Sequence, residues 1–158
     1  MLIPTQACYD VQAYSLGLLV DPATKTIHGT LTMQAAIVAA TGSVTLDLDG
    51  NLTVARVEVD GEQVEVVHAD GRIEVPCKRA PGAEITVAVT YGGTPRVAPN
   101  PPWGGGFTWA KTSTGEPWIA TTCQGEGADL WWTGARRHRR RGATRVDAGG
   151  EGPHRAAD

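Results

Sequence analysis

The chain has 158 residues, 41% of them hydrophobic, and a formal net charge of −3, a composition typical of one soluble globular domain. No run approaches the roughly 18 consecutive apolar residues that a membrane span needs, and residues 1–5 (MLIPT) lack the charged and long apolar regions of a signal peptide. We therefore expect a cytoplasmic protein without membrane contact, unless its true start lies upstream.

From residue 9 to residue 91 the dominant hydrophobic period is two, which is the period of a half-buried β-strand. The first alternating run covers residues 11–20 and ends at a turn signal, residues 21–24 (DPAT). The second run covers residues 27–37, and the third, residues 44–48, closes at Gly50-Asn51. These runs predict three successive strands.

The next stretch predicts a bulge and two tight hairpins. The alternation over residues 52–59 slips by one residue near Ala55, which is the pattern of a β-bulge. Asp60-Gly61 and Asp70-Gly71 are hairpin signals, because Gly tolerates the positive φ that tight primed turns require. With the clean alternation over residues 85–91, seven or eight strands are expected. The fold class is therefore all-β, with two packed antiparallel sheets of the sandwich or saddle kind.

Residues 92–106 are rich in Gly and Pro and cannot run inside a central strand, so we expect a surface loop there. The aromatic segment at residues 107–109 (FTW) follows. Residues 118–123 (WIATTC) then predict a buried strand that ends at residues 124–127 (QGEG).

The cysteines and histidines do not predict a metal or redox site. The three cysteines are Cys8, Cys77 and Cys123, an odd number at wide spacings without a Cys-x-x-Cys pair. We expect buried or half-buried thiols, although a bridge through Cys8 in an exported relative stays open. The four histidines also lack ligand spacing. No cofactor and no catalytic residue are therefore expected in this chain.

Residues 133–158 are a different kind of sequence from the rest. Residues 1–132 carry a net charge of −7, whereas residues 133–158 carry seven Arg and three acidic residues, a net +4. This tail has no Leu, Ile, Met, Phe, Tyr or Trp. It cannot bury enough apolar surface to offset the entropy of ordering, so we expect it to be disordered.

Two segments near residue 132 carry a resemblance to a known family. Residues 103–109 (WGGGFTW) and 115–132 (GEPWIATTCQGEGADLWW) are similar to the end of the N-terminal domain in bacterial M1-family zinc aminopeptidases. Five earlier segments resemble the same domain in the same order: residues 7–11 (ACYDV), 20–29 (VDPATKTIHG), 46–48 (LDL), 57–61 (VEVDG) and 89–95 (VTYGGTP). The resemblance covers residues 7–132.

The resemblance implies a saddle-shaped β domain that leans on a thermolysin-like catalytic domain. It also implies that Gln124 helps to hold the free α-amino group of a peptide substrate, because a cationic amine needs a fixed oxygen acceptor. Glu126 could share that site, although a solvated loop acid is the alternative for this residue. The tryptophans are expected to pack against the sheet and the catalytic domain rather than to bind substrate.

This sequence departs from the family in two ways. It contains no His-Glu-x-x-His, the helical pair of zinc ligands with its general base, and no Gly-x-Met-Glu-Asn segment. The zinc of the intact family therefore belongs to a missing catalytic domain, and we expect the chain not to hydrolyse peptides by itself. After Trp132 the family's Pro-Cys-Lys-Asp-type stretch is replaced by an Arg-rich one, which suggests a frameshift near codon 133 and a truncated product.

Three alternatives stay open at this point. The chain could be a free-standing β-sandwich binding module without a missing partner domain. It could bind nucleic acid through Arg136–Arg141, although the acidic body and the lack of interleaved aromatic residues argue against such a partner. A separately encoded catalytic piece could also complement the chain in trans.

Overall fold

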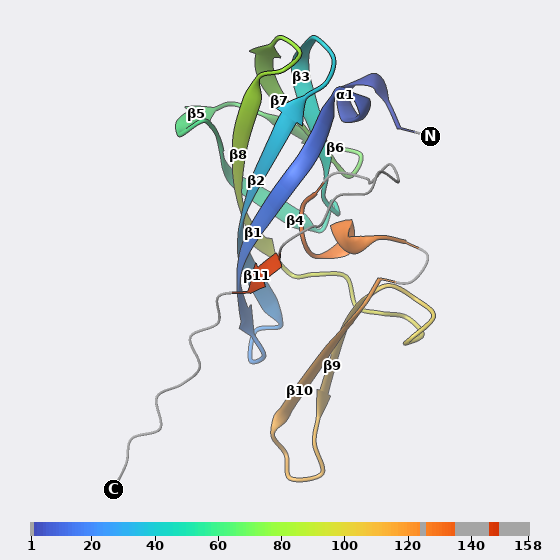
Figure 1. Ribbon diagram of the computed structural model, residues 1–158. Helices are drawn as coiled ribbons and strands as arrows, with labels where there is room; N and C mark the ends of the chain where they lie inside the picture. The colour runs from blue at the N-terminus through green and yellow to red at the C-terminus, as the bar shows by residue number, and fades with distance from the viewer. Residues whose placement is uncertain (1, 124–125, 135–145, 149–158) are drawn as a thin grey trace, which may run out of the picture.

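The computed structural model describes residues 2–123, 126–134 and 146–148, and it confirms the all-β prediction (Figure 1). Two short helical segments also occur, α1 (Pro4–Ala7) and the 3-10 turn η1 (Ala128–Leu130). The strands in chain order are β1 (Tyr9–Asp21), β2 (Thr26–Ile37), β3 (Thr41–Asp47), β4 (Leu52–Val59), β5 (Glu62–Val64), β6 (Val67–Ala69), β7 (Arg72–Arg79), β8 (Glu84–Gly93), β9 (Gly106–Lys111), β10 (Pro117–Thr122) and β11 (Val146–Ala148).

The described strands form three sheets rather than the predicted two. The largest has six strands in the order β11-β1-β2-β8-β4-β5, and a three-stranded sheet has the order β3-β7-β6. The hairpin of β9 and β10 is a sheet of its own. All pairs are antiparallel except β1 with β11, which is parallel.

The core lies between the inner faces of the six-stranded and three-stranded sheets. Alternate residues of β2 and β8 are buried, as the period of two predicts, and Leu31, Met33 and Val89 have no exposed surface. Val44 and Ile73 contribute from the smaller sheet and belong to the same cluster of buried side chains. The opposite face carries polar residues such as His28, Thr30 and Thr90, together with the exposed Leu19.

The predicted turns and bulge are confirmed. Asp60 and Gly61 both have positive φ, 53° and 86°, as do Asp70 and Gly71, 51° and 72°, which is the pattern of a two-residue type I′ hairpin. The register of β4 against β8 shifts between Val54 and Arg56, next to the residue where the alternation slips. The sequence pattern therefore located this irregularity to within one residue.

One prediction about burial is wrong. All but the last of residues 118–123 lie in a strand, β10, but none of the β10 residues is buried, and Trp118 is 50% exposed. The reason is that β10 pairs only with β9, and the hairpin extends away from the sheets (Figure 1). Within the described residues, no helix has the length and apolar character needed to cross a membrane.

Most of the tail that we predict to be disordered, residues 135–145 and 149–158, lies outside the described residues, and so do Arg136–Arg141. The described part of the tail is attached to the body. Thr133 is fully buried, and Gly134 exchanges two backbone hydrogen bonds with Asp47, of 2.9 and 3.2 Å. An isolated antiparallel bridge therefore lies two residues past Trp132.

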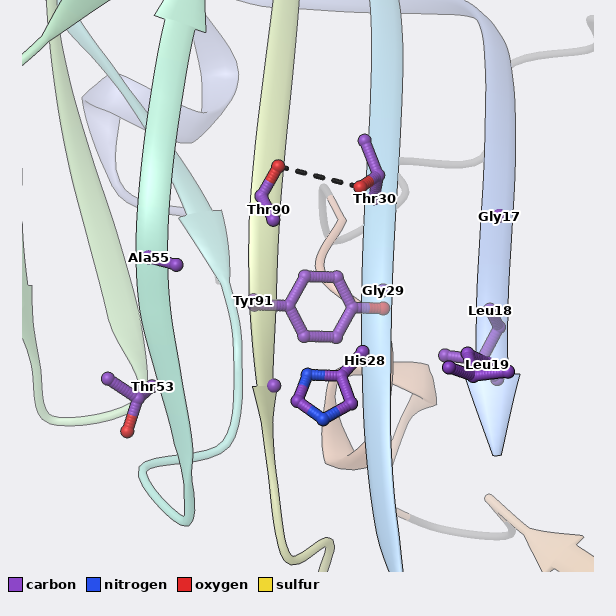
Figure 2. A pocket seen from close by; sticks show the side chains of 11 residues that line it. Gly17, Leu18, Leu19, His28, Gly29, Thr30, Thr53, Ala55, Thr90 and Tyr91 are labelled. Atoms are coloured by element: carbon purple, nitrogen blue, oxygen red, sulfur yellow. Dashed lines mark hydrogen bonds between the residues drawn. The ribbon is translucent and has the colours of Figure 1, made fainter. Parts of the chain in front are cut away.

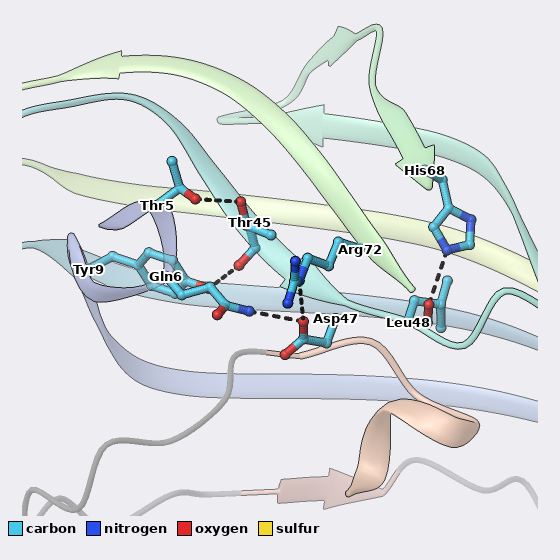
Figure 3. A network of polar contacts seen from close by, with 8 residues as sticks. All are labelled: Thr5, Gln6, Tyr9, Thr45, Asp47, Leu48, His68 and Arg72. Carbon is cyan, nitrogen blue, oxygen red and sulfur yellow. Dashed lines mark hydrogen bonds and ion pairs between the residues drawn. The ribbon is translucent and has the colours of Figure 1, made fainter. Parts of the chain in front are cut away.

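A polar network fastens the N-terminal segment to the smaller sheet (Figure 3). The buried Gln6 donates from Nε2 to Asp47 Oδ1 at 2.9 Å. The Tyr9 hydroxyl donates to the Thr45 carbonyl at 2.7 Å, and the Thr45 hydroxyl bonds that of Thr5 at 2.8 Å. Burial raises the pKa of Tyr9 well above its ordinary value, so this hydroxyl stays a donor.

Candidate functional site

Glu126 links the end of the β9–β10 hairpin to the Gly- and Pro-rich loop before β9. Its carboxylate forms an ion pair with Arg96, with Nη1 and Oε2 2.6 Å apart. The Gly105 backbone N–H donates to Glu126 Oε1 at 3.3 Å. The side chains of Arg96 and Glu126 are 39% and 35% exposed, so the pair contributes little to stability and mainly fixes geometry.

Two glycines of that loop permit this close approach. A Cβ at Gly105 would overlap Leu130 Cδ1, and one at Gly106 would lie 2.5 Å from the carbonyl oxygen of Arg96. Gly106 also has a φ of 136°, which residues with a side chain rarely adopt. Gly105 is therefore needed to pack the loop against Leu130, and Gly106 is needed where β9 passes close to Arg96.

Residues 126–134 are held in place by hydrogen bonds from distant parts of the body. The Asp49 N–H donates to the Asp129 carbonyl at 2.8 Å, and the Tyr91 hydroxyl donates to the Trp131 carbonyl at 3.2 Å. The Trp131 Nε1–H donates to Cys123 Sγ at 3.1 Å. The residues on both sides of positions 124–125 are therefore anchored.

Tyr91 reaches Trp131 by lying across a glycine of the neighbouring strand. Tyr91 and Gly29 are paired on β8 and β2, and a Cβ at Gly29 would lie 2.5 Å from Tyr91 Cζ. One residue along, on the opposite face of the sheet, the His28 ring lies over Gly92 in the same way (Figure 2). This outer face has a shallow hollow lined by His28, Thr30 and Thr90, among others.

The tryptophans divide into a packed group and an exposed group. Trp109 stacks on Phe107 with ring centroids 5.0 Å apart, and Trp131 meets Phe107 edge-on at 6.2 Å. By contrast, Trp103 is 69% exposed and Trp118 is 50% exposed. The expected packing against the sheet therefore holds for the first group, and the second group faces solvent.

The sequence-predicted site residues have different outcomes. Gln124 lies outside the described residues, whereas Glu126 is placed at the base of the hairpin with Arg96 as its partner. Sequence reasoning missed Arg96 and Gly105, because no local pattern links them to a residue more than 20 positions away. The only available signal was the glycine run itself.

The thiols occur as expected, and the described residues do not gather a metal site. Cys8 and Cys77 are buried, Cys123 is half-buried, and all three are free. Burial raises the pKa of the Cys77 thiol. Across residues 2–123, 126–134 and 146–148, no group of three or more His, Cys, Asp or Glu side chains could hold a metal ion.

Comparison with solved structures identifies proteins that share this fold, although no protein-family model and no curated protein sequence matches the chain. An M1 zinc metallopeptidase from Deinococcus radiodurans is 26% identical, with a TM-score of 0.52 over 66% of this chain and 26% of that one. A mutant of that enzyme bound to a Tyr-Ser-Ala substrate is 24% identical, with a TM-score of 0.53 over 68% of this chain and 27% of that one.

Leukotriene A4 hydrolase from Saccharomyces cerevisiae gives a TM-score of 0.63 at 16% identity, over 82% of this chain and 21% of that one. This chain therefore spans about a quarter of the length of the proteins that it matches. The fold is that of the N-terminal domain in M1 zinc metallopeptidases, and the resemblance inferred from the sequence is confirmed.

Proposed function

We propose that this chain, an M1-type N-terminal β domain, helps to bind the amino terminus of a peptide while a separate zinc domain performs hydrolysis. The observation that supports the proposal is the bracing of Glu126 by Arg96 and the Gly105 N–H. This bracing fixes the backbone two residues after Gln124, and the Trp131–Cys123 contact fixes it one residue before.

The chemistry assigns different roles to the two candidate residues. An α-ammonium group has three N–H donors and needs oxygen acceptors held in position, which the side-chain amide of Gln124 can supply. The Glu126 carboxylate already forms an ion pair with Arg96 and accepts a hydrogen bond from the Gly105 N–H. We therefore propose Gln124 as the direct acceptor and Glu126, already paired with Arg96, as the residue that positions the backbone beside it.

The proposed zinc is not assigned to this chain. The described residues gather no ligand cluster, and His28 and His68 lie on different sheets. His68 is also engaged with the Leu48 carbonyl at 3.1 Å. We propose that a catalytic domain outside these 158 residues holds the metal, and that this chain works in the cytoplasm without nucleic acid or membrane as a partner.

The exposed tryptophans favour a domain that docks on a partner over a free-standing module. Trp103 and Trp118 are large apolar side chains, and Trp118 lies on a hairpin that leaves the body. A tryptophan buries a large apolar area when it docks on a partner. We propose this surface as the contact with the catalytic domain, which also permits complementation in trans.

To test this role, the tripeptide Tyr-Ser-Ala is added to the full chain, and binding is monitored through changes in the NMR chemical shifts of the chain. The free-amine peptide should shift the resonances of residues 123–126, whereas the N-acetylated peptide should not. Gln124→Ala should abolish the shifts and Glu126→Gln should weaken them, with Glu116→Gln as the matched control at the far end of the hairpin. Equal binding of the acetylated peptide would refute the assignment.

A second measurement addresses catalysis. The purified chain with added zinc should show no aminopeptidase turnover and should not retain zinc through dialysis. A tightly held, stoichiometric zinc ion would overturn the proposal that the metal belongs to another domain.

A further inference from the structure

The first strand presents a long free edge. β1 has 13 residues and pairs with β2 along its whole length, from Tyr9 opposite Ile37 to Asp21 opposite Thr26. On its other side, the only described partner is β11, which pairs with Tyr14, Ser15 and Leu16. Most of the outward backbone N–H and C=O groups of β1 therefore have no strand partner among the described residues.

This edge lacks the features that usually protect an edge strand. Natural edges are short, charged, bulged away or interrupted by proline. Residues 11–20 (VQAYSLGLLV) contain neither a charged residue nor a proline. By contrast, β5 and β6, which are edges too, have three residues each. The register shift in β1 lies near its start, between Val11 and Ala13, so the rest of the edge is regular.

A distant segment of the same chain already uses this edge. Val146–Ala148 lies parallel to β1, in register from Val146 opposite Tyr14 to Ala148 opposite Leu16 (Figure 1). It comes from more than 120 residues away, so local chain connectivity does not impose this pairing. Within the described part of the chain, this segment pairs with three of the 13 residues of β1.

We propose that the free edge of β1 binds an extended segment of another polypeptide by strand addition, parallel to β1 and in place of Val146–Ala148. The ends of the strand define the chemistry of the partner. Asp10 and Asp21 flank an uncharged stretch, residues 11–20, so the segment that fits is uncharged and β-branched over about ten residues, with a basic residue at each end. This inference does not depend on the proposed role of Gln124.

The probe is a fluorescein-labelled peptide of alternating valine and threonine with a lysine at each end, added to the full chain and followed by fluorescence anisotropy. Two further peptides carry N-methyl groups on the odd or on the even residues. The added strand pairs with β1 through one of its two edges only. One methylated peptide should therefore bind at least about tenfold more weakly than the unmethylated peptide, and the other should bind as tightly as the unmethylated peptide does. Equal binding of all three peptides would overturn strand addition.

A pair of variants tests competition with the resident segment. Asp147→Pro removes the backbone donor and disrupts β11, so the peptide should bind about tenfold more tightly. Asp147→Ala keeps the backbone donor, so this variant should bind the peptide as tightly as the unaltered chain does. If both variants bind equally, the peptide does not use the site of β11 and the proposal is wrong.

Hydrogen exchange locates the bound peptide. At saturation the amides of β1 should exchange more slowly, whereas those of β5 and β6 should not change. Light scattering covers the case of a second copy of this chain as the occupant. A dimer that the peptide cannot dissociate would overturn the proposal.

Discussion

Gly29→Ala should loosen the attachment of residues 126–134 to the body. The Tyr91 ring lies across Gly29, and a Cβ there would lie 2.5 Å from Tyr91 Cζ and 2.7 Å from its hydroxyl oxygen. Tyr91 is 1% exposed, so the ring cannot turn away without disturbing the core. The displaced hydroxyl would then lose its 3.2 Å hydrogen bond to the Trp131 carbonyl.

The expected cost follows from three contributions. Overpacking a core typically costs about 1–3 kcal/mol, and a lost hydrogen bond costs about 1 kcal/mol. The smaller conformational freedom of alanine in the unfolded chain offsets roughly 0.4–1 kcal/mol. We therefore expect Gly29→Ala to lower the free energy of unfolding by about 1–3 kcal/mol, with the larger part from overpacking.

The matched control is another glycine of the same sheet. At Gly17 a Cβ would meet nothing nearer than the Thr30 carbonyl oxygen at 4.0 Å, so Gly17→Ala should be neutral or slightly stabilising. Urea unfolding followed by tryptophan fluorescence gives both values. Tyr91→Phe, which removes only the hydrogen bond, should couple with Gly29→Ala in a double-mutant cycle. If Gly29→Ala and Gly17→Ala have the same stability, the steric reasoning is refuted.

Three further predictions concern other parts of the molecule. Gln6→Ala removes a donor to the buried Asp47 carboxylate and should lower the free energy of unfolding by about 1–3 kcal/mol in the same urea assay; an unchanged midpoint would contradict it. Hydrogen bonds from the Thr86 N–H and the Arg79 side chain lower the pKa of the Asp60 carboxyl from its ordinary value. The Asp60 carboxylate stabilises the fold fully at pH values above its ordinary pKa, and this stabilisation is lost as the pH falls through the lowered pKa. Asp60→Asn should therefore make the free energy of unfolding fall less steeply as the pH is lowered. Trp118→Ser should change stability by less than about 0.5 kcal/mol, but should reduce binding of an apolar dye, and undiminished dye binding would argue against an exposed docking surface.

The strands could be predicted because they depend on a local pattern. Alternation alone located β2 and β8, and the pairs Asp60-Gly61 and Asp70-Gly71 located two hairpins. The slip near Ala55 located the bulge, because an extra residue changes the phase of burial within the strand itself. All of these features involve residues that are close in sequence.

The features that escaped prediction are long-range. The pairing of Gly134 with Asp47 and of Arg96 with Glu126 depends on how the sheets pack, which no period reveals. The exposure of Trp118 was mispredicted for a related reason, since an apolar strand looks the same in sequence whether or not a second sheet covers it. Strand β10 is exposed because, among the described residues, no second sheet packs over it.

The described contacts that hold residues 126–134, which follow the proposed amine-binding residue, come from the body of the domain. Every anchor described for residues 126–134 comes from an earlier part of the chain: Asp47 and Asp49 beside β3, Tyr91 on β8, and Arg96 and Gly105 in the loop before β9. Each of these contacts forms between residues that precede 135. Replacing the sequence after residue 134 should therefore leave the Glu126–Arg96 pair and the Tyr91–Trp131 bond in place.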